Sequence, residues 1–206
     1  QITKAYDFTG ENNPYQKPCI KNRSTHGQAV FTSINKNLSK TIKPEFYVFK
    51  VFNLDGSQNI KALKKSLLEI EKLNINLIVM AVGFINLKEK PTNPKILTFV
   101  ASGVSGNGVR PSDTLWPQEL TEENIVLFSH YFTSLTGDKM SPTGHLDPTS
   151  LHKNKINFLV NIDHEKKVNL SGSSLAVALA TTKFVNFCPL PSHLKEALHC
   201  LKNNSQ

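Results

Sequence analysis

A serine at the start of an apolar helix is the first candidate for chemistry in this 206-residue chain. The segment 170–176 reads Leu-Ser-Gly-Ser-Ser-Leu-Ala, and mostly apolar residues follow it. Ser174 would therefore lie where unpaired backbone N–H groups and the positive end of the helix dipole gather. Such a position suits a nucleophile whose attack on a carbonyl group creates an oxyanion. Taken alone, the segment is better explained by a serine that caps a buried helix.

A histidine and an aspartate occupy positions that suit a base and the acid that orients it. His26 lies in the segment 24–27, Ser-Thr-His-Gly, at the first turn of a predicted helix, where the glycine lets another backbone approach closely. Asp7 ends a predicted strand and is followed by a Thr-Gly pair at 9–10. In open α/β sheets, sites lie beyond the carboxyl ends of strands. Each residue alone also fits an ordinary surface or turn position.

The elements that must position these residues alternate between strands and helices. Strands are predicted from apolar, β-branched or aromatic runs, and helices from apolar residues that recur every three to four positions. The predicted strands cover 2–6, 46–52, 76–82, 95–101, 124–132 and 156–162. The predicted helices cover about 25–38, 58–73, 174–187 and 191–202. The segments 103–122 and 133–155 are rich in turn-forming residues and are predicted to be loops.

Several of the predicted strands are continuous apolar runs without alternation, which is typical of a parallel sheet covered on both faces. The expected fold class is therefore α/β, a three-layer α/β/α arrangement with a mostly parallel central sheet. No repeat or linker divides the chain, so we expect one domain over 1–206.

Composition narrows the classes of partner. The chain is 39% hydrophobic and 19% charged, and no apolar run approaches the roughly 20 residues of a membrane span. Its start reads as a strand and a turn rather than a signal peptide. The net charge of +8 comes from scattered lysines without a dense basic stripe, so we expect no nucleic-acid partner. We also expect no membrane span.

The three cysteines, Cys19, Cys188 and Cys200, match no zinc or redox motif. A Cys188–Cys200 disulfide would form in an oxidising compartment. Three reduced thiols are the alternative, and the sequence leaves both open.

Together and in this order, the three polar motifs resemble those of the subtilase family of subtilisin-like serine proteases. Asp7 with the Thr-Gly pair is similar to the family's Asp-(Ser/Thr)-Gly motif. The segment 26–30, His-Gly-Gln-Ala-Val, is similar to its His-Gly-Thr-His-Val helix start, and 172–176, Gly-Ser-Ser-Leu-Ala, to its Gly-Thr-Ser-Met-Ala turn. Two further stretches extend the resemblance. Residues 78–83, Ile-Val-Met-Ala-Val-Gly, resemble a strand that pairs with the substrate backbone, and 96–108 resemble the strand and glycine-rich loop that carry the oxyanion-hole asparagine.

The resemblance implies a subtilisin-like fold and a serine endopeptidase that works through an acyl-enzyme intermediate. Ser174 would attack the peptide carbonyl, His26 would transfer the proton to the leaving amine, and Asp7 would orient His26. The N–H group of Ser174 would give one oxyanion-hole donor. The second would come from Asn107 if three extra residues are allowed in the loop, whereas an ungapped alignment places Val104 there.

The resemblance also implies two walls of a primary substrate-binding pocket. One wall would be Ala81, Val82 and Gly83, and the other Ala101, Ser102 and Gly103. Small residues there would leave room for a medium or large apolar side chain of the substrate. No acidic residue lines the pocket floor in this reading, so a strict requirement for Arg or Lys is not expected.

The chain departs from the family's pattern at several points. Phe8 is inserted after Asp7, Gln28 and Ala29 replace Thr-His, Ala81 replaces a serine and Ala178 replaces a proline. These departures support an alternative, a catalytically impaired pseudoprotease that acts as a binding or regulatory protein. No loop has the composition of a calcium site, and we expect neither metal nor cofactor. The expected partners are a protein or peptide substrate and a propeptide or inhibitor, and the expected location is secreted or exported.

Two other hydrolase classes fit the sequence less well. A metal-dependent hydrolase would have to draw its ligands from acidic residues and histidines whose spacing matches no zinc pattern: His130, His145, Asp147, His152, Asp163 and His164. An α/β-hydrolase esterase requires Gly-x-Ser-x-Gly, with an acid and a histidine after the serine. Here Ala176 replaces the second glycine, and Glu196 is the only acidic residue beyond that helix, so this class fails on residue order.

Overall fold

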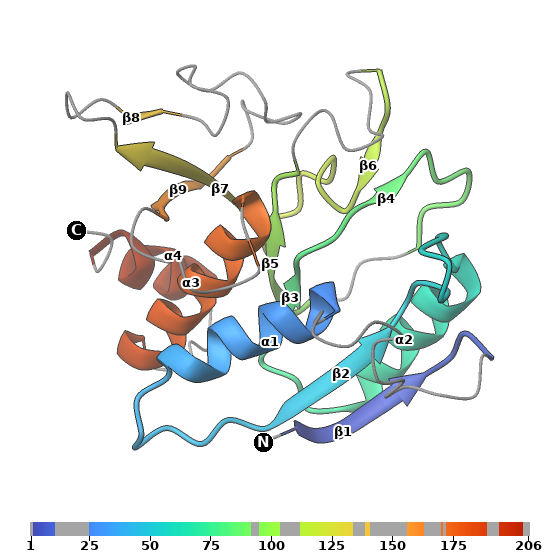
Figure 1. The fold of residues 1–206 in the computed structure, drawn as a ribbon, viewed down its shortest axis with the longest axis horizontal. Helices are drawn as coiled ribbons and strands as arrows, with labels where there is room; N and C mark the ends of the chain where they lie inside the picture. The colour runs from blue at the N-terminus through green and yellow to red at the C-terminus, as the bar shows by residue number, and fades with distance from the viewer. Residues whose placement is uncertain are drawn as a thin grey trace. The chain divides into compact units, whose positions relative to one another are not determined.

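The computed structural model describes residues 2–10, 25–91, 95–103, 112–133, 139–140, 156–162, 170, 172–188 and 194–203. These residues belong to two compact units, which are described separately below (Figure 1). The first unit comprises Gln1–Arg23, Lys40–Ile75 and Lys88–Lys95. The second comprises Ser24–Ser39, Asn76–Leu87 and Ile96–Gln206.

The described part of the first unit forms a two-stranded parallel sheet and one helix. Strand β1, Ile2–Asp7, pairs with β2, Phe46–Lys50, in a register that sets Asp7 opposite Lys50. Helix α2, Ile60–Lys72, begins where the Asn59 side chain accepts a hydrogen bond from the Ala62 N–H at 2.9 Å. This contact satisfies one of the backbone donors that a helix start leaves unpaired.

The second unit is built on a mostly parallel sheet. Its strands are β3, Leu77–Met80, β5, Leu97–Ala101, β7, Ile125–Thr133, and β9, Phe158–Asn161, and they lie parallel in that order. The short strand β8, Lys139–Met140, pairs antiparallel with β7. Because parallel strands share one direction, their carboxyl ends gather at one edge of this sheet.

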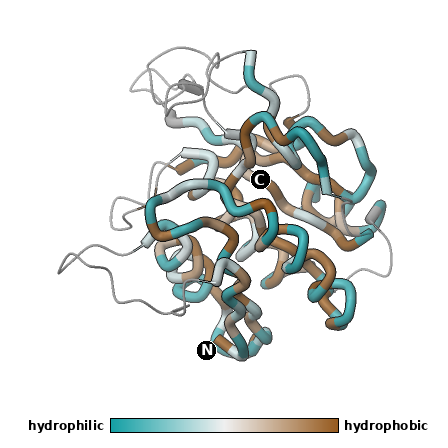
Figure 2. Tube along the Cα trace, turned by 90° about the vertical axis from the view of Figure 1, so that its right-hand side faces the viewer, coloured by the Kyte–Doolittle hydropathy of each residue, from teal (hydrophilic) through white to brown (hydrophobic). Residues whose placement is uncertain are grey.

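Among the described residues of the second unit, one helix covers the sheet and two more pack against that helix. Helix α3, Gly172–Phe187, contacts all four parallel strands, while α1, His26–Asn37, and α4, Leu194–Asn203, pack against α3. Apolar and polar stretches alternate along the Cα trace in Figure 2, as expected of elements that bury one face.

An aromatic cluster fills the space between α3 and the sheet. The ring centroid of Phe99 lies 4.9 Å from that of Phe128 and 5.2 Å from that of Phe184, and all three side chains are buried. Small residues of α3, among them Ala176 and Ala180, let the helix approach the strands closely. The position of α3 is therefore set mainly by apolar packing.

A disulfide joins the end of α3 to α4. Cys188 and Cys200 are bonded, with their Cα atoms 5.9 Å apart. Of the two alternatives that the sequence left open, the structure has the oxidised one. Cys19 lies outside the described residues.

After Met80 the chain leaves the parallel sheet and forms a small separate ladder. Strand β4, Phe84–Ile85, pairs antiparallel with β6, Leu115–Trp116. Meanwhile β5 stays paired with β7, and the Ser102 N–H donates to the Phe128 carbonyl at 2.9 Å. The chain beyond β3 and the chain beyond β5 therefore diverge at the carboxyl edge.

The coarse fold prediction is confirmed, because the described residues form a mixed α/β structure with a mostly parallel sheet and four helices. Each predicted strand and helix has a counterpart. The predictions of loop over 103–122 and 133–155 missed β6 and β8, two strands that are too short to show a period. The three-layer arrangement and the single domain stay predictions. Among the described helices, none has the length and apolar character to cross a membrane.

Candidate functional site

Two of the predicted catalytic side chains converge on one backbone oxygen in the second unit. The Nε2 atom of His26 lies 3.0 Å from the carbonyl oxygen of Ala81. The hydroxyl of Ser174 donates to the same oxygen at 3.1 Å. The Nε2 atom of His26 and the Oγ atom of Ser174 therefore lie close together, separated by no more than the sum of these two distances, although the residues are far apart in the sequence.

His26 owes its position to the start of α1. Thr25 caps the helix in an extended conformation, and its side chain accepts a hydrogen bond from the Gln28 N–H at 3.3 Å. Ala29 and Val30 point into the core, while His26, one turn earlier, stays exposed. The cap thus begins the helix at the residue that carries the imidazole.

Two hydrogen bonds tie α1 to the helix that carries the serine. The Thr182 hydroxyl donates to the Ile34 carbonyl at 3.3 Å, and the Asn186 amide donates to the Asn37 carbonyl at 3.0 Å. These contacts fix the two helices relative to each other, and with them the imidazole and the serine.

Ser174 lies in the first turn of α3. Gly172 opens the helix with a φ of 67°, a left-handed conformation that glycine adopts without strain. Ser173 is buried and Ser174 is half-buried, so the second serine is the one that a substrate could reach. The first-turn N–H groups have no partner within the helix and can stabilise a negative charge.

Ala81 follows directly after Met80, the last residue of β3. The carbonyl that His26 and Ser174 share therefore lies at the carboxyl edge of the parallel sheet, where α/β proteins bind their ligands. The predicted substrate-binding walls lie at the same edge. Residues 81–83 lead from β3 to β4, and residues 101–103 close β5.

The contact with Ala81 fixes where a proton must be on the imidazole. A carbonyl oxygen only accepts hydrogen bonds, so the Nε2 atom of His26 carries a proton in this arrangement. A general base needs that nitrogen unprotonated. The Ser174 hydroxyl likewise donates its hydrogen bond to the Ala81 carbonyl and not to the imidazole.

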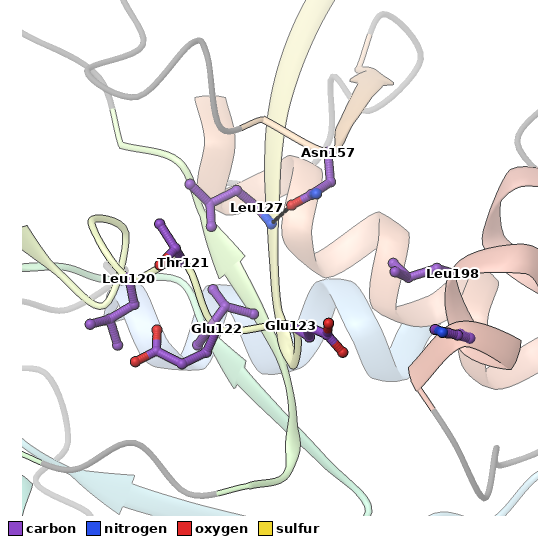
Figure 3. A pocket seen from close by; sticks show the side chains of 9 residues that line it. Leu120, Thr121, Glu122, Glu123, Leu127, Asn157 and Leu198 are labelled. Carbon is purple, nitrogen blue, oxygen red and sulfur yellow. Dashed lines mark hydrogen bonds between the residues drawn. The ribbon is translucent and has the colours of Figure 1, made fainter.

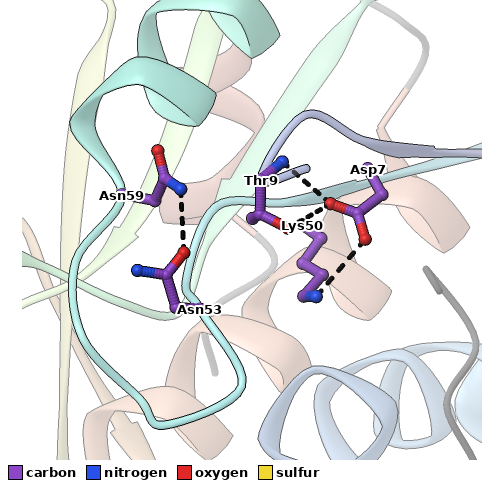
Figure 4. Close-up of polar contacts among 5 residues, drawn as sticks. All are labelled: Asp7, Thr9, Lys50, Asn53 and Asn59. Atoms are coloured by element: carbon purple, nitrogen blue, oxygen red, sulfur yellow. Dashed lines mark hydrogen bonds and ion pairs between the residues drawn. The ribbon is translucent and has the colours of Figure 1, made fainter. Parts of the chain in front are cut away.

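Asp7 lies in the first unit, at the end of β1, and is held by a polar cluster of its own (Figure 4). Its carboxylate accepts hydrogen bonds from the Thr9 N–H at 2.8 Å and from the Thr9 hydroxyl, and forms an ion pair with Lys50 at 3.3 Å. Its side chain is only 6% exposed. Burial alone would raise the pKa of Asp7, but the bonds from Thr9 and Lys50 outweigh it and hold the pKa below 3.8.

Several predicted residues lie outside the described part of the chain. Asn107 and Val104, the two candidates for the second oxyanion-hole donor, are among them. Of the possible ligands for a metal-dependent hydrolase, only His130 is described, and it lies buried on β7. Within the described ranges, no group of three or more His, Cys, Asp or Glu side chains could hold a metal ion.

An open hollow at the other edge of the sheet has different chemistry. It lies at the amino ends of β7 and β9, and Glu122, Glu123, Asn157 and Leu198 are among its lining residues (Figure 3). Asn157 is already engaged, because its side chain accepts from the Leu127 N–H at 2.7 Å. The described lining residues include no serine, cysteine or histidine. This hollow therefore lacks the groups for nucleophilic catalysis.

Sequence reasoning missed two residues that shape these regions. Lys50 was not singled out, because its pairing with Asp7 depends on the register of β1 and β2. Gln118 was not singled out either, since it lies in a stretch predicted to be loop. Its amide donates to Val82 at 3.2 Å and to Ala101 at 2.9 Å, one residue from each wall. No local pattern in the sequence points to either residue.

A scan against models of known protein families gives no match for this chain, and no curated protein matches it. Functional inference therefore depends on the site itself.

Proposed function

We propose that the protein is a subtilisin-like serine endopeptidase with Ser174 as nucleophile and His26 as general base. The observation that carries the proposal is the convergence of the Ser174 hydroxyl and the His26 imidazole on the Ala81 carbonyl. A serine at a helix start, an exposed histidine close by and the carboxyl edge of a parallel sheet form a setting that suits acyl transfer.

In the proposed reaction, the Ser174 oxygen attacks the carbonyl carbon of the scissile peptide while His26 takes the hydroxyl proton. The N–H of Ser174 stabilises the resulting oxyanion, together with a second donor from Asn107. His26 then gives its proton to the leaving amine, and an acyl-enzyme forms. A water molecule, deprotonated by His26, attacks this ester. The bond to the Ser174 oxygen then breaks, His26 gives its proton to that oxygen, and the acid product is released.

This reaction requires a change from the arrangement at Ala81. The Nε2 atom of His26 must lose its proton and accept from Ser174, so the imidazole must carry its proton on Nδ1. An ionised carboxylate that accepts from Nδ1 favours this tautomer. On the sequence resemblance alone, we propose Asp7 for this role. Its lowered pKa suits it, because it stays ionised at neutral pH.

A binding or regulatory protein without catalysis is the second candidate. The observation that favours it is that both His26 and Ser174 donate to the Ala81 carbonyl and not to each other. If that arrangement persists when a substrate binds, the serine has no base and the site can only bind peptides.

Covalent labelling separates the two candidates. A fluorophosphonate should modify Ser174 of the folded protein, as located by mass spectrometry, and the Ser174→Ala variant should not react. Ser173→Ala is the matched control, because this neighbouring serine is buried and should be dispensable for labelling. Peptide cleavage should fall on the order of 10⁶-fold in the Ser174→Ala variant. Folded wild-type protein that never reacts would favour the binding protein.

The Cys188–Cys200 disulfide supports a location outside a reducing compartment, because disulfides persist where the environment is oxidising. We therefore propose that the protein is secreted or exported. Its proposed partners are a protein or peptide substrate and a propeptide or inhibitor that covers the site.

A further inference from the structure

The space between the two predicted pocket walls is occupied by the chain itself. The parallel ladder between β3 and β5 ends at the pair Met80 and Val100. Beyond that pair, one strand continues into β4 and the other stays with β7, so the two backbones separate at the carboxyl edge, and we call the filled space between them the crevice. The segment that follows β6 places Gln118 in this crevice.

The Gln118 side chain bridges the two diverging backbones. Its Nε2 donates to the Val82 carbonyl at 3.2 Å and to the Ala101 carbonyl at 2.9 Å. Both amide hydrogens are thereby used, so the orientation of the carboxamide is fixed. The residue is 1% exposed, and its Oε1 is buried without a hydrogen-bond partner among the described residues.

Gln118 and a residue of β6 cover the glycines of the two walls. A Cβ atom at Gly83 would lie 2.8 Å from the Nε2 atom of Gln118. A Cβ atom at Gly103 would lie 3.1 Å from a methyl group of Leu115, a buried residue of β6. The room that small wall residues would leave for a substrate is therefore taken by Gln118 and Leu115.

From these contacts we infer that Gln118 makes the site selective for peptides with a small residue, glycine or alanine, on the amino side of the scissile bond. This inference rests on the proposed function and replaces the sequence-based expectation of a medium or large apolar side chain. A larger side chain would have to displace a carboxamide that holds two backbone carbonyls together. The cost would be both hydrogen bonds and the packing against Gly83.

The test uses two peptidyl phosphonates that differ only in the residue next to phosphorus, alanine or phenylalanine. The rate of Ser174 modification is measured with the full chain as wild type, Gln118→Ala and Gln118→Met. Wild type should react at least about 100-fold faster with the alanine probe. Gln118→Ala should gain at least about 10-fold in rate with the phenylalanine probe.

Gln118→Met is the matched control, because it keeps the length of the side chain but removes both hydrogen bonds. It should retain most of the preference for alanine, because its side chain still fills the space against Gly83. Leu115→Ala opens the crevice from the other wall and should also raise the rate with the phenylalanine probe. It provides a second route if Gln118→Ala does not fold.

The outcomes separate this inference from the proposed function. Equal rates of wild type with both probes would overturn the inference and leave the serine mechanism standing. Unchanged selectivity in both folded opening variants would also overturn it. If neither probe modifies Ser174 in any folded variant, the proposed function fails and the inference fails with it.

Discussion

The two regions that carry predicted catalytic residues hold them by different physical means. In the second unit, α3 presents Ser174 from a helix that is anchored by aromatic packing and by a disulfide at its far end. In the first unit, Asp7 is held by hydrogen bonds from Thr9 and an ion pair with Lys50. Apolar packing is insensitive to pH, whereas a buried carboxylate stabilises the fold only while it is ionised. The comparison therefore predicts that the first unit is sensitive to loss of the Asp7 charge and to acid, and that the second is sensitive to loss of its disulfide.

Of the changes that compare the two units, replacing the carboxylate at position 7 should have the largest effect. Asp7→Asn removes the negative charge that would favour the productive tautomer of His26, so kcat should fall about 10⁴-fold. Lys50→Met is the matched control, because it breaks the ion pair while the carboxylate stays. Peptide cleavage by both variants is measured at neutral pH. Similar small losses in the two variants would mean that Asp7 serves only the local ion pair.

A smaller effect, on stability and not on chemistry, should come from the disulfide. The Cys188→Ala/Cys200→Ala double variant should lose about 3 kcal/mol in free energy of unfolding, as expected for a loop of this length. Urea titration of wild type with and without a reductant gives the same comparison without mutation.

Cys19→Ala controls for the replacement of a cysteine by alanine, and we expect it to leave the unfolding curve in place. Because the disulfide lies at the far end of α3, the labelling rate of Ser174 in the folded double variant should match wild type. A large drop in that rate would show that the start of the helix depends on its end, contrary to anchoring by the aromatic cluster.

What could be predicted from the sequence differs between local and long-range features. The stripe of apolar residues in α2 and the continuous apolar run of β3 are local, and both elements lie where they were expected. The contact of Thr9 with Asp7 spans two residues and lies within one recognised motif. These features depend on neighbours in the chain, which a single sequence displays.

The interactions that were missed depend on how distant segments pair. Lys50 meets Asp7 only because β1 and β2 are parallel in one register. Gln118 enters the crevice only because β6 pairs with β4, and both strands are two residues long. The family resemblance predicted that Ser174 would contact His26 directly, and the shared contact of both side chains with the Ala81 carbonyl was not predicted.

The smallest effect is the pH dependence of the first unit, and it tests the comparison most directly. The pKa of Asp7 is lower in the folded protein than its ordinary value of 3.8. The stabilisation that the carboxylate provides is therefore fully present above that ordinary value. It is lost as the pH falls through the lower folded value. In urea titrations between pH 6 and pH 2.5, we expect wild type to have a higher free energy of unfolding than Asp7→Asn. The difference should be constant near neutral pH and shrink only in acid.

Other carboxylates also have lowered pKa values, so the wild-type curve alone would be ambiguous. The pKa of Asp55 is lowered by hydrogen bonds from Ser57, and that of Glu89 by its hydrogen bond and ion pair with Lys64. Both remain in Asp7→Asn, so the difference between the two proteins isolates Asp7. Lys50→Met should keep the hydrogen bonds from Thr9 but lose the effect of Lys50 on the pKa of Asp7. The free energy of unfolding of this variant should therefore fall over a narrower range of acid pH. A difference that is the same at every pH would mean that Asp7 stabilises the first unit through the shape of its side chain and not through its charge.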